Sequence, residues 1–262
     1  MADVVRLAVD ERRVARITLN RPEVKNAFDA TLVAELAAAV AAVPADARCV
    51  VLGSEGDTFC AGADLAWMRS MADYDRDQNI ADSRALAGVF AALDGLPMPL
   101  LARVQGAAIG GGAGLVAVAD IAVAAEGATF AFTEVRLGIL PAVISPYVVR
   151  KVGPAFATAA FTTGIRFDSH RAFATGLVQS VVDPHQLDPE IDRFIAAIAA
   201  GGPAAVNAAK RLVREVDGRD PAAVRELTVE RIADARVGAE GQDGMRAVLE
   251  KRRPGWLGGG DR

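Results

Sequence analysis

The stretch AIGGGAGLVAVAD, residues 108–120, places three adjacent glycines inside an apolar segment. Three glycines in a row cost more backbone entropy on folding than an ordinary core helix would. The apolar run PLLARV, 99–104, is typical of a buried strand, and GLVAVAD, 114–120, is expected to form a short helix. The glycines therefore lie where a strand leads into a helix N-terminus, and the free N–H groups there favour negative charge.

The glycine pattern does not match the common phosphate-binding motifs. A dinucleotide fingerprint, Gly-x-Gly-x-x-Gly, would need glycine where the sequence has Leu115 or Ala117. The Gly-Lys-Ser/Thr of a phosphate loop is also missing. An oxyanion hole fits better, because glycine lets a ligand oxygen approach the N–H groups with no Cβ in the way. Close packing of a helix on a strand would also explain the glycines.

A second corner, FCAGADL at 59–65, has the same features. It follows the buried-strand pattern CVVLGS, 49–54, and Asp64 stands where it can cap a helix that begins near Leu65. Two such corners can direct two N–H donors at one carbonyl oxygen.

Alternating strand and helix patterns continue through the rest of the chain and predict an α/β fold with parallel pairing. The last third, from about 184 to 252, is predicted to be nearly all helical. The other predicted elements are a β-hairpin at 4–20, a loop at 21–28, a helix at 30–43 capped by Asp29, a helix at 78–93, and strands at 121–125 and 176–183.

Composition narrows the class of protein. The 262 residues are 52% hydrophobic and 24% charged, with a formal net charge of -4, which argues against a nucleic-acid binder. The cysteines, Cys49 and Cys60, lie in apolar surroundings and predict a reducing compartment without disulfides. The N-terminus shows no signal peptide, and Asp120 interrupts the longest apolar run, so we expect a cytoplasmic protein without a membrane span.

Together these segments resemble the crotonase (enoyl-CoA hydratase/isomerase) superfamily, and the resemblance covers nearly the whole chain. The segments occur in the family's order, which is a far more specific signal than one glycine motif. They are LNRPEVKNAFD (19–29), FCAGADL (59–65), VQGAAIGGGAGLVAVADIAVA (104–124), FAFTEVRLGILPAVISPYVVRKVG (130–153) and TGIRFDSHRAFATGLVQSVV (163–182).

The resemblance implies a ββα spiral core, placed at residues 1–195, and a helical C-terminal region, 196–262, that builds a homotrimer or a dimer of trimers. It implies an acyl-CoA substrate, with coenzyme A as part of the substrate and no separate cofactor. The thioester oxygen would lie between the N–H groups of Ala63 and Gly111. The positions expected to contact substrate or CoA are Lys25, Ala27, Ala61, Asp64, Leu65, Gly110 and Trp256.

Many hydratases of the family hold one water between two glutamates. One position matches Glu134 in FTEVRLG, but the other is Gly114. Hydration would then require one carboxylate to activate the water and return a proton to C2, whereas isomerisation needs only a single base. The segments GADLAWMRSMADY (62–74), GGGAGL (110–115) and RLGILPAVISPYV (136–148) nevertheless resemble a bacterial branch of methylglutaconyl-CoA hydratases with glycine at that position.

We therefore expect hydration of a short, branched enoyl-CoA first and Δ3,Δ2-enoyl-CoA isomerisation second. Dehalogenation or decarboxylation on the same fold ranks third. A non-catalytic relative that binds acyl-CoA is the remaining alternative, although Glu134 in its matching context favours catalysis.

Several further residues have both a chemical and a plain structural interpretation. Ser145 and Tyr147 could help Glu134 hold a water, and Arg136 or Arg84 could bind a distal carboxylate. A helix cap or a surface charge would also explain them. Asp120 is expected to be structural and Cys60 a buried hydrophobe, and the spacing of His170 and His185 predicts no metal site.

Overall fold

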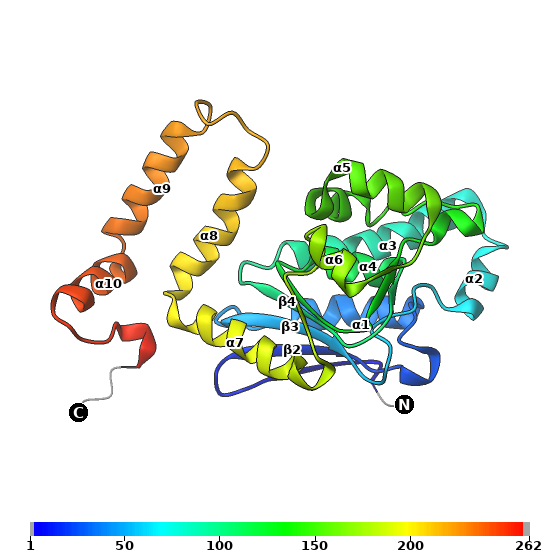
Figure 1. Cartoon of the computed structure of the whole chain (residues 1–262), viewed down its shortest axis with the longest axis horizontal. Helices are drawn as coiled ribbons and strands as arrows, with labels where there is room; N and C mark the ends of the chain where they lie inside the picture. Colours follow the sequence, from blue (N-terminus) through cyan, green and yellow to red (C-terminus); the bar gives the residue numbers. More distant parts are fainter. Residues whose placement is uncertain (1–2, 259–262) are drawn as a thin grey trace. The chain divides into compact units, whose positions relative to one another are not determined.

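The structure, a computed structural model, describes residues 3–258. The chain divides into two compact units (Figure 1). One comprises Met1–Leu96 and Leu100–Asp192, and the other comprises Pro97–Pro99 and Arg193–Arg262. The predicted regions 1–195 and 196–262 both include terminal residues, 1–2 and 259–262, that lie outside the described part.

The first unit is built on two sheets. Within residues 3–258, a larger sheet has the strand order β1-β2-β3-β4-β6-β9 and a smaller one has the order β5-β7-β8. The hairpin predicted at 4–20 is confirmed by the antiparallel β1 and β2, and the remaining pairs of the larger sheet are parallel. The strands are β1 (Val5–Val9), β2 (Val14–Leu19), β3 (Cys49–Ser54), β4 (Leu100–Val104), β5 (Ala108–Ile109), β6 (Ile121–Ala125), β7 (Thr129–Ala131), β8 (Phe167–Asp168) and β9 (Ser180–Val182).

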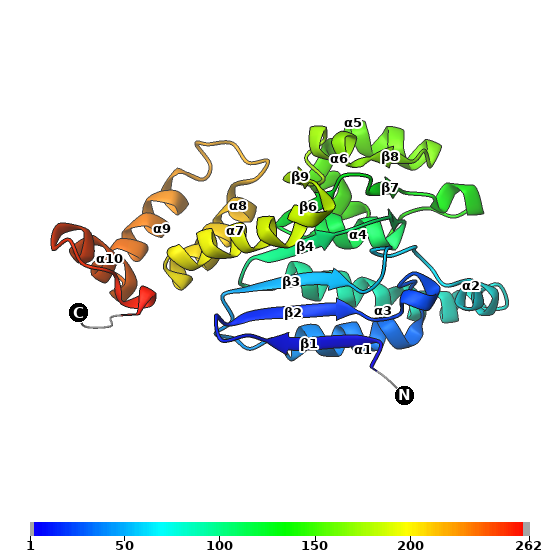
Figure 2. The same cartoon turned by 60° about the horizontal axis from the view of Figure 1, so that its bottom comes forward.

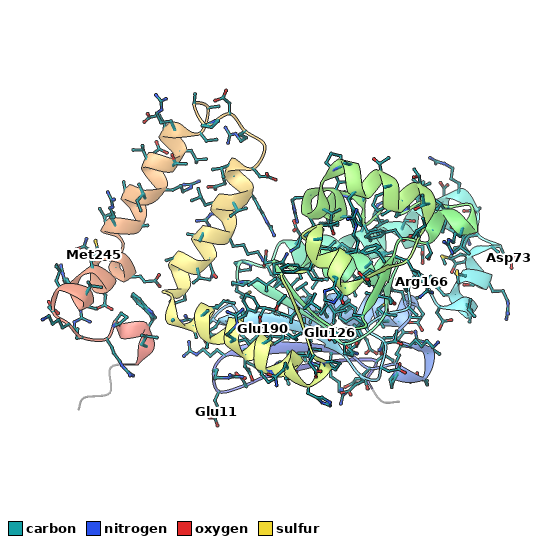
Figure 3. All side chains as sticks on the ribbon, in the orientation of Figure 1. Glu11, Asp73, Glu126, Arg166, Glu190 and Met245 are labelled. Carbon is teal, nitrogen blue, oxygen red and sulfur yellow. The ribbon has the colours of Figure 1, made fainter. Side chains whose placement is uncertain are left out.

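The continuous apolar runs become central strands because both faces of the sheet are covered. Strands β1 to β4 lie side by side, with α1 packed against β1 and β2 and also against α3 (Figure 2). Side chains fill the space between the sheet and the helices (Figure 3). The largest fully buried side chains include Phe28, Phe59, Phe90, Phe130 and Phe132.

Helices α1 and α2 begin after Asp29 and Asp64, the capping residues that the sequence indicated, whereas the cap Asp75 of α3 was not predicted and the helix expected at 78–93 begins at Arg76. Asp29 caps α1 by accepting a hydrogen bond from Leu32 N at 2.7 Å, and Asp75 and Gln78 form a capping box on α3. The helices are α1 (Ala30–Ala41), α2 (Leu65–Met71), α3 (Arg76–Asp94), α4 (Gly111–Val118), α5 (Ser145–Thr163), α6 (Ser169–Ala174) and the start of α7 (Leu187–Ala200), with short 3₁₀ turns η1 (Pro22–Val24), η2 (Glu134–Leu137) and η3 (Pro184–Gln186).

Helix α4 differs from the prediction of a helix at 114–120, because it begins at Gly111 and includes two of the three adjacent glycines. It packs against α3 and α5, and its residues from Gly112 to Val118 are buried. Its C-terminal end is held by the half-buried Lys151 of α5, whose Nζ donates to Ala119 O at 2.7 Å and to Asp120 O at 3.0 Å. The hydrogen bonds of Lys151 thus hold the C-terminal end of α4 in place within the core.

One strand prediction needed correction, and one sheet was missed. The strand expected at 176–183 is shorter, Ser180–Val182, because a turn precedes it. The small sheet of β5, β7 and β8 was not predicted, since its strands of two or three residues are too short to show an alternating pattern. That sheet matters because β5 leads directly into the glycines of α4.

The second unit is helical, as predicted for the last third. It contains the end of α7, then α8 (Pro203–Val216), α9 (Arg225–Val237), α10 (Ala239–Leu249) and the short η4 (Gly255–Leu257). Glu240 accepts hydrogen bonds from Ala204 N at 2.9 Å and Ala205 N at 2.8 Å, which joins α10 to the first turn of α8. No helix within residues 3–258 has the length and apolar character needed to cross a membrane.

Candidate active site

The corner at 60–64 lies against the segment that contains β5. Cys60 N donates to Ala107 O at 3.0 Å, and Ile109 N donates to Cys60 O at 2.9 Å. A Cβ on Gly62 would lie 3.1 Å from Ile109 O, so the two backbones approach too closely for a larger residue. The two glycine-containing corners predicted from the sequence are therefore in contact.

The backbone around Ala63 is paired with Phe28. Phe28 N donates to Gly62 O at 2.7 Å, and Asp64 N donates to Phe28 O at 2.8 Å, so both hydrogen bonds flank Ala63. Because successive N–H groups of extended backbone point to opposite sides, the Ala63 N–H points away from Phe28. It donates no hydrogen bond to another described residue.

The second corner turns at Gly110. This residue has φ 54° and ψ -120°, a conformation open to glycine, and its N–H donates to Ala131 O at 2.8 Å. Helix α4 begins at the next residue, so the N–H of Gly111 has no carbonyl one turn earlier to bond within the helix. The free N–H and the helix dipole make this end of α4 suited to hold a developing negative charge.

The glycines of α4 permit close contact with the first corner and with Phe28. A Cβ on Gly112 would lie 2.8 Å from the Cys60 Cβ, and one on Gly111 would lie 3.0 Å from the Phe28 Cε2 atom. Phe28 therefore meets both corners, through its backbone at Ala63 and through its ring at Gly111. The adjacent glycines are needed because Phe28 and Cys60 lie so close to α4 that a side chain at Gly111 or Gly112 would collide with them.

Glu134 is carried to the same place by η2. A Cβ on Gly110 would lie 3.1 Å from Glu134 Oε1 and 3.5 Å from Glu134 Cδ, so the carboxylate rests on the bare backbone of the second corner. Its Oε2 atom is buried and has no hydrogen-bond partner among the described residues. Burial raises the pKa of the Glu134 carboxyl above its ordinary value, which is opposed by a hydrogen bond from its own backbone N–H.

One turn further along α4, the same face of the helix is apolar. Gly114 N donates to Gly110 O at 3.0 Å, and a Cβ on Gly114 would overlap the Ile144 side chain and lie 3.1 Å from Phe90 Cε1. Ile144 is 3% exposed. The position at which many family hydratases carry a second glutamate is thus filled by apolar atoms, and Glu134 has no acidic neighbour there.

The comparisons with known proteins identify the family of the chain. Residues 10–259 match the family described as Enoyl-CoA hydratase/isomerase. The chain belongs to this family. A crotonyl-CoA hydratase of Syntrophomonas wolfei is 32% identical over 94% of this chain and 95% of its own, and the 2,3-dehydroadipyl-CoA hydratase of Escherichia coli is 32% identical over 95% and 96%. The crystal structure of an enoyl-CoA hydratase from Shewanella pealeana superposes with a TM-score of 0.92, at 38% identity over 97% of this chain and 96% of that one.

These matches confirm the predicted crotonase superfamily, its fold, and an enzyme of the enoyl-CoA hydratase type. They do not separate the methylglutaconyl-CoA hydratase branch from the rest of the family, so that assignment stays a prediction.

The other residues predicted for the hydratase/isomerase site differ in exposure. Ala61 N donates to Lys25 O at 3.0 Å, so the exposed Lys25 adjoins the first corner. Ala27 is 5% exposed, whereas Leu65, the first residue of α2, is 76% exposed. Asp64 accepts from Ala66 N at 2.7 Å, which confirms its role as the cap of α2.

Trp256 belongs to the second unit, where its Nε1 donates to Ala200 O at 3.1 Å. Its contact with CoA stays a prediction.

Of the residues considered as helpers of Glu134 or as anion ligands, Ser145 and Tyr147 have structural partners. Ser145 Oγ donates to Ala142 O at 2.8 Å at the start of α5, and Tyr147 stacks on Phe90 with ring centroids 5.8 Å apart. Arg136 Nε covers Gly164, where a Cβ would lie 3.1 Å away. Arg84 is exposed on α3.

The structural interpretation of Asp120 is confirmed, since its Oδ2 accepts from Leu100 N at 2.7 Å.

Cysteine and histidine offer no competing chemistry in the part of the chain that the structure describes. Cys60 is fully buried, and burial raises the pKa of its thiol to about 12, which keeps it protonated. Within residues 3–258, no group of three or more His, Cys, Asp or Glu side chains could hold a metal ion.

Sequence reasoning missed residues that shape the site without reacting. Asn26 is fully buried with φ 54°, and its Nδ2 donates to Glu55 O and Thr58 O, both at 2.8 Å, which ties the loop before α1 to the loop before the first corner. An Asn in a polar loop is a known signal of left-handed backbone and could have been noticed. Phe28 and Ile144 carried no such signal, because their importance depends on contacts between distant segments.

Proposed function

We propose that this member of the family adds water across the 2,3 double bond of a short, branched enoyl-CoA. The observation that supports the proposal is the contact between the two glycine corners, together with the buried carboxylate of Glu134 beside Gly110 of the second corner. In the proposal, the N–H groups of Ala63 and Gly111 are the two donors. A thioester oxygen between two N–H donors would develop negative charge as the β-carbon is attacked, and such donors stabilise it.

In this mechanism Glu134 performs both proton transfers. Its carboxylate accepts a proton from water as the water oxygen bonds to C3, and the electrons of the double bond move towards the thioester oxygen to give an enolate. Glu134 then donates that proton to C2, the enolate collapses to the thioester, and one molecule of water has been added. The raised pKa of Glu134 suits both steps. It makes the carboxylate a stronger base toward water, and it keeps the resulting carboxyl protonated until it returns the proton to C2.

The apolar filling of Gly114 favours a second candidate, Δ3,Δ2-enoyl-CoA isomerisation. Isomerisation moves one proton from C2 to C4 through an enolate and needs a single base. Ile144 and Phe90 pack against Gly114 and leave no room for a second carboxylate on that face of α4. Isomerisation tolerates this, because it does not need a second carboxylate.

The substrate proposal rests on the likeness of three segments to methylglutaconyl-CoA hydratases, namely 62–74, 110–115 and 136–148. The Escherichia coli relative is named for a dehydroadipyl-CoA substrate. Coenzyme A would be part of the substrate, bound along Lys25, Ala27, Ala61 and Leu65, with no further cofactor. We also propose the trimer or dimer of trimers, a location in the cytoplasm, and no metal, nucleic acid or membrane partner.

The test is to offer the purified protein 3-methylglutaconyl-CoA, crotonyl-CoA and a 3-enoyl-CoA in separate reactions. Loss of the absorbance of the conjugated thioester from either of the first two supports hydration. Appearance of that absorbance from the 3-enoyl-CoA alone supports isomerisation instead. Tight binding of all three CoA esters without reaction would show that both proposals are wrong and would favour a non-catalytic acyl-CoA-binding relative.

A further inference from the structure

Arg21 lies between the caps of two helices. Its guanidinium Nη1 donates to Ala27 O at 2.7 Å, and its Nη2 lies 3.0 Å from Asp29 Oδ2 and 3.4 Å from Asp64 Oδ2. The Arg21 side chain is 14% exposed, and those of Asp29 and Asp64 are 26% and 12% exposed. The contacts of this cluster are therefore largely shielded from water, unlike those of an ordinary surface ion pair.

Each aspartate of the cluster divides its two oxygens between two tasks. Asp29 Oδ1 accepts from Leu32 N in the first turn of α1, and Asp64 Oδ1 accepts from Ala66 N in the first turn of α2, both at 2.7 Å. The second oxygen of each carboxylate meets Arg21. One guanidinium thereby joins the N-termini of both helices and offsets the repulsion between two like charges.

The position of the two caps in the chain connects this cluster to the proposed oxyanion site. Asp29 follows Phe28 and Asp64 follows Ala63, and Phe28 and Ala63 are the residues paired across the first corner. Through its contacts with Asp29 and Asp64, Arg21 therefore holds the two segments together at the residues that directly follow the Phe28–Ala63 pair. It also accepts two hydrogen bonds at its own carbonyl, from Val24 N at 3.1 Å and Asn26 N at 2.8 Å, and Asn26 Oδ1 accepts from Arg21 N at 2.9 Å, so its backbone is held as well.

We propose that Arg21 is a positioning residue that sets the direction of the Ala63 N–H by holding Asp64 against Asp29. This inference rests on the proposed function, because it gives the Ala63 amide a thioester oxygen to meet. Without Arg21 the two carboxylates repel, Asp64 turns, and the amide one residue earlier rotates off the oxygen. Arginine is required because its planar fork reaches two carboxylates and a carbonyl at once, which an ammonium group cannot do.

The experiment uses the full-length protein and two readouts. The first is the absorbance of bound 4-dimethylaminocinnamoyl-CoA, a conjugated thioester whose absorbance moves to longer wavelength as its carbonyl is polarised by hydrogen bonds. The second is the separation of kcat from KM with the substrate that the wild-type protein turns over. We expect Arg21→Met to lose most of the wavelength shift and about tenfold to a hundredfold in kcat, with KM changed less than about threefold. Arg21→Lys should recover part of both.

Two further variants keep the proposal falsifiable if Arg21→Met does not fold. Asp64→Asn retains a good capping side chain for α2 but removes the charge by which Arg21 holds residue 64, while the Arg21–Asp29 pair stays, so it should reproduce the loss of wavelength shift. Arg103→Met is the matched control, because Arg103 of β4 also forms an ion pair, with Asp188 of α7, whose Oδ2 lies 3.0 Å from Arg103 Nη2, and neither residue caps a helix at the two corners. It should keep the wild-type wavelength shift and kcat.

The outcomes separate the two proposals. If the wild-type protein binds the cinnamoyl-CoA without any wavelength shift, the two-amide site is wrong and the role of Arg21 falls with it. If the wild-type protein shifts the absorbance while folded Arg21→Met and Asp64→Asn shift it equally at unchanged kcat, the site stands and only the role of Arg21 is overturned.

Discussion

Substitution of Gly110 by alanine tests the contact between Glu134 and the second corner. The added Cβ would lie 3.1 Å from Glu134 Oε1, a separation tighter than nine in ten Cβ contacts in proteins, so the carboxylate must move by a few tenths of an ångström. The residue also has φ 54°, where an L-amino acid is strained. Gly110→Ala should therefore affect both catalysis and stability.

The two effects have different sizes. Backbone strain of this kind costs about 2 kcal/mol, which lowers Tm by roughly 4–8 °C in a domain of this size. A displacement of about 1 Å in an active site can reduce the rate a hundredfold, so a smaller movement of the Glu134 carboxylate should reduce kcat about tenfold.

The assay combines initial rates, followed by the absorbance of the conjugated thioester, with thermal unfolding. Gly127→Ala is the matched control, because Gly127 has φ 84° in the turn between β6 and β7 and a Cβ there would meet nothing within 4 Å. It should lose stability but keep kcat. If Gly110→Ala loses stability like Gly127→Ala and keeps wild-type kcat, the placement of Glu134 on Gly110 does not matter for the reaction and the reasoning is refuted.

Glu134→Gln should lower kcat by about a thousandfold without weakening CoA-ester binding. In the wild-type protein, kcat/KM should fall as the pH drops through the raised pKa of Glu134, because the ionised carboxylate is the base. A flat pH profile would contradict this. Gly114→Ala should destabilise the protein by about 1–3 kcal/mol, measured by denaturant unfolding. Much of this loss should be recovered when Ile144→Ala is added in a double variant. Additive effects of the two substitutions would show that the predicted overlap is absent. Burial lowers the pKa of Lys151 to about 8, so between pH 8 and 10.5 the unfolded chain binds a proton that the folded chain has released. The unfolding free energy of the wild-type protein, relative to that of Lys151→Met, should therefore rise with pH across that window. A constant difference between the two proteins would count against the shift.

Much of the fold could be predicted because its signals are local. The buried strands β3, β4 and β6 are continuous apolar runs, and Asp29 and Asp64 mark helix starts through the chemistry of capping. The short strands β5, β7 and β8 could not be predicted, because they depend on pairing between segments that are distant in the chain.

The candidate site divides in the same way. The glycine corners and Glu134 were found from the sequence, because a bare backbone before a helix and an acid in a matching segment are visible in the residues themselves. The ring of Phe28 on Gly111, the filling of Gly114 by Ile144, and the bridge of Arg21 between two caps were not visible. Each joins residues far apart in the sequence, and ordinary apolar or charged residues give no sign of such contacts.

The central claim is that two backbone amides and one carboxylate act on the same thioester. A crystal structure of the Glu134→Gln variant with bound crotonyl-CoA tests it most directly. The account predicts the thioester oxygen at about 2.7–3.1 Å from both Ala63 N and Gly111 N, with the side chain of residue 134 beside C2 and C3. A bound thioester whose oxygen meets neither amide, or whose C2 and C3 lie beyond reach of residue 134, would contradict it.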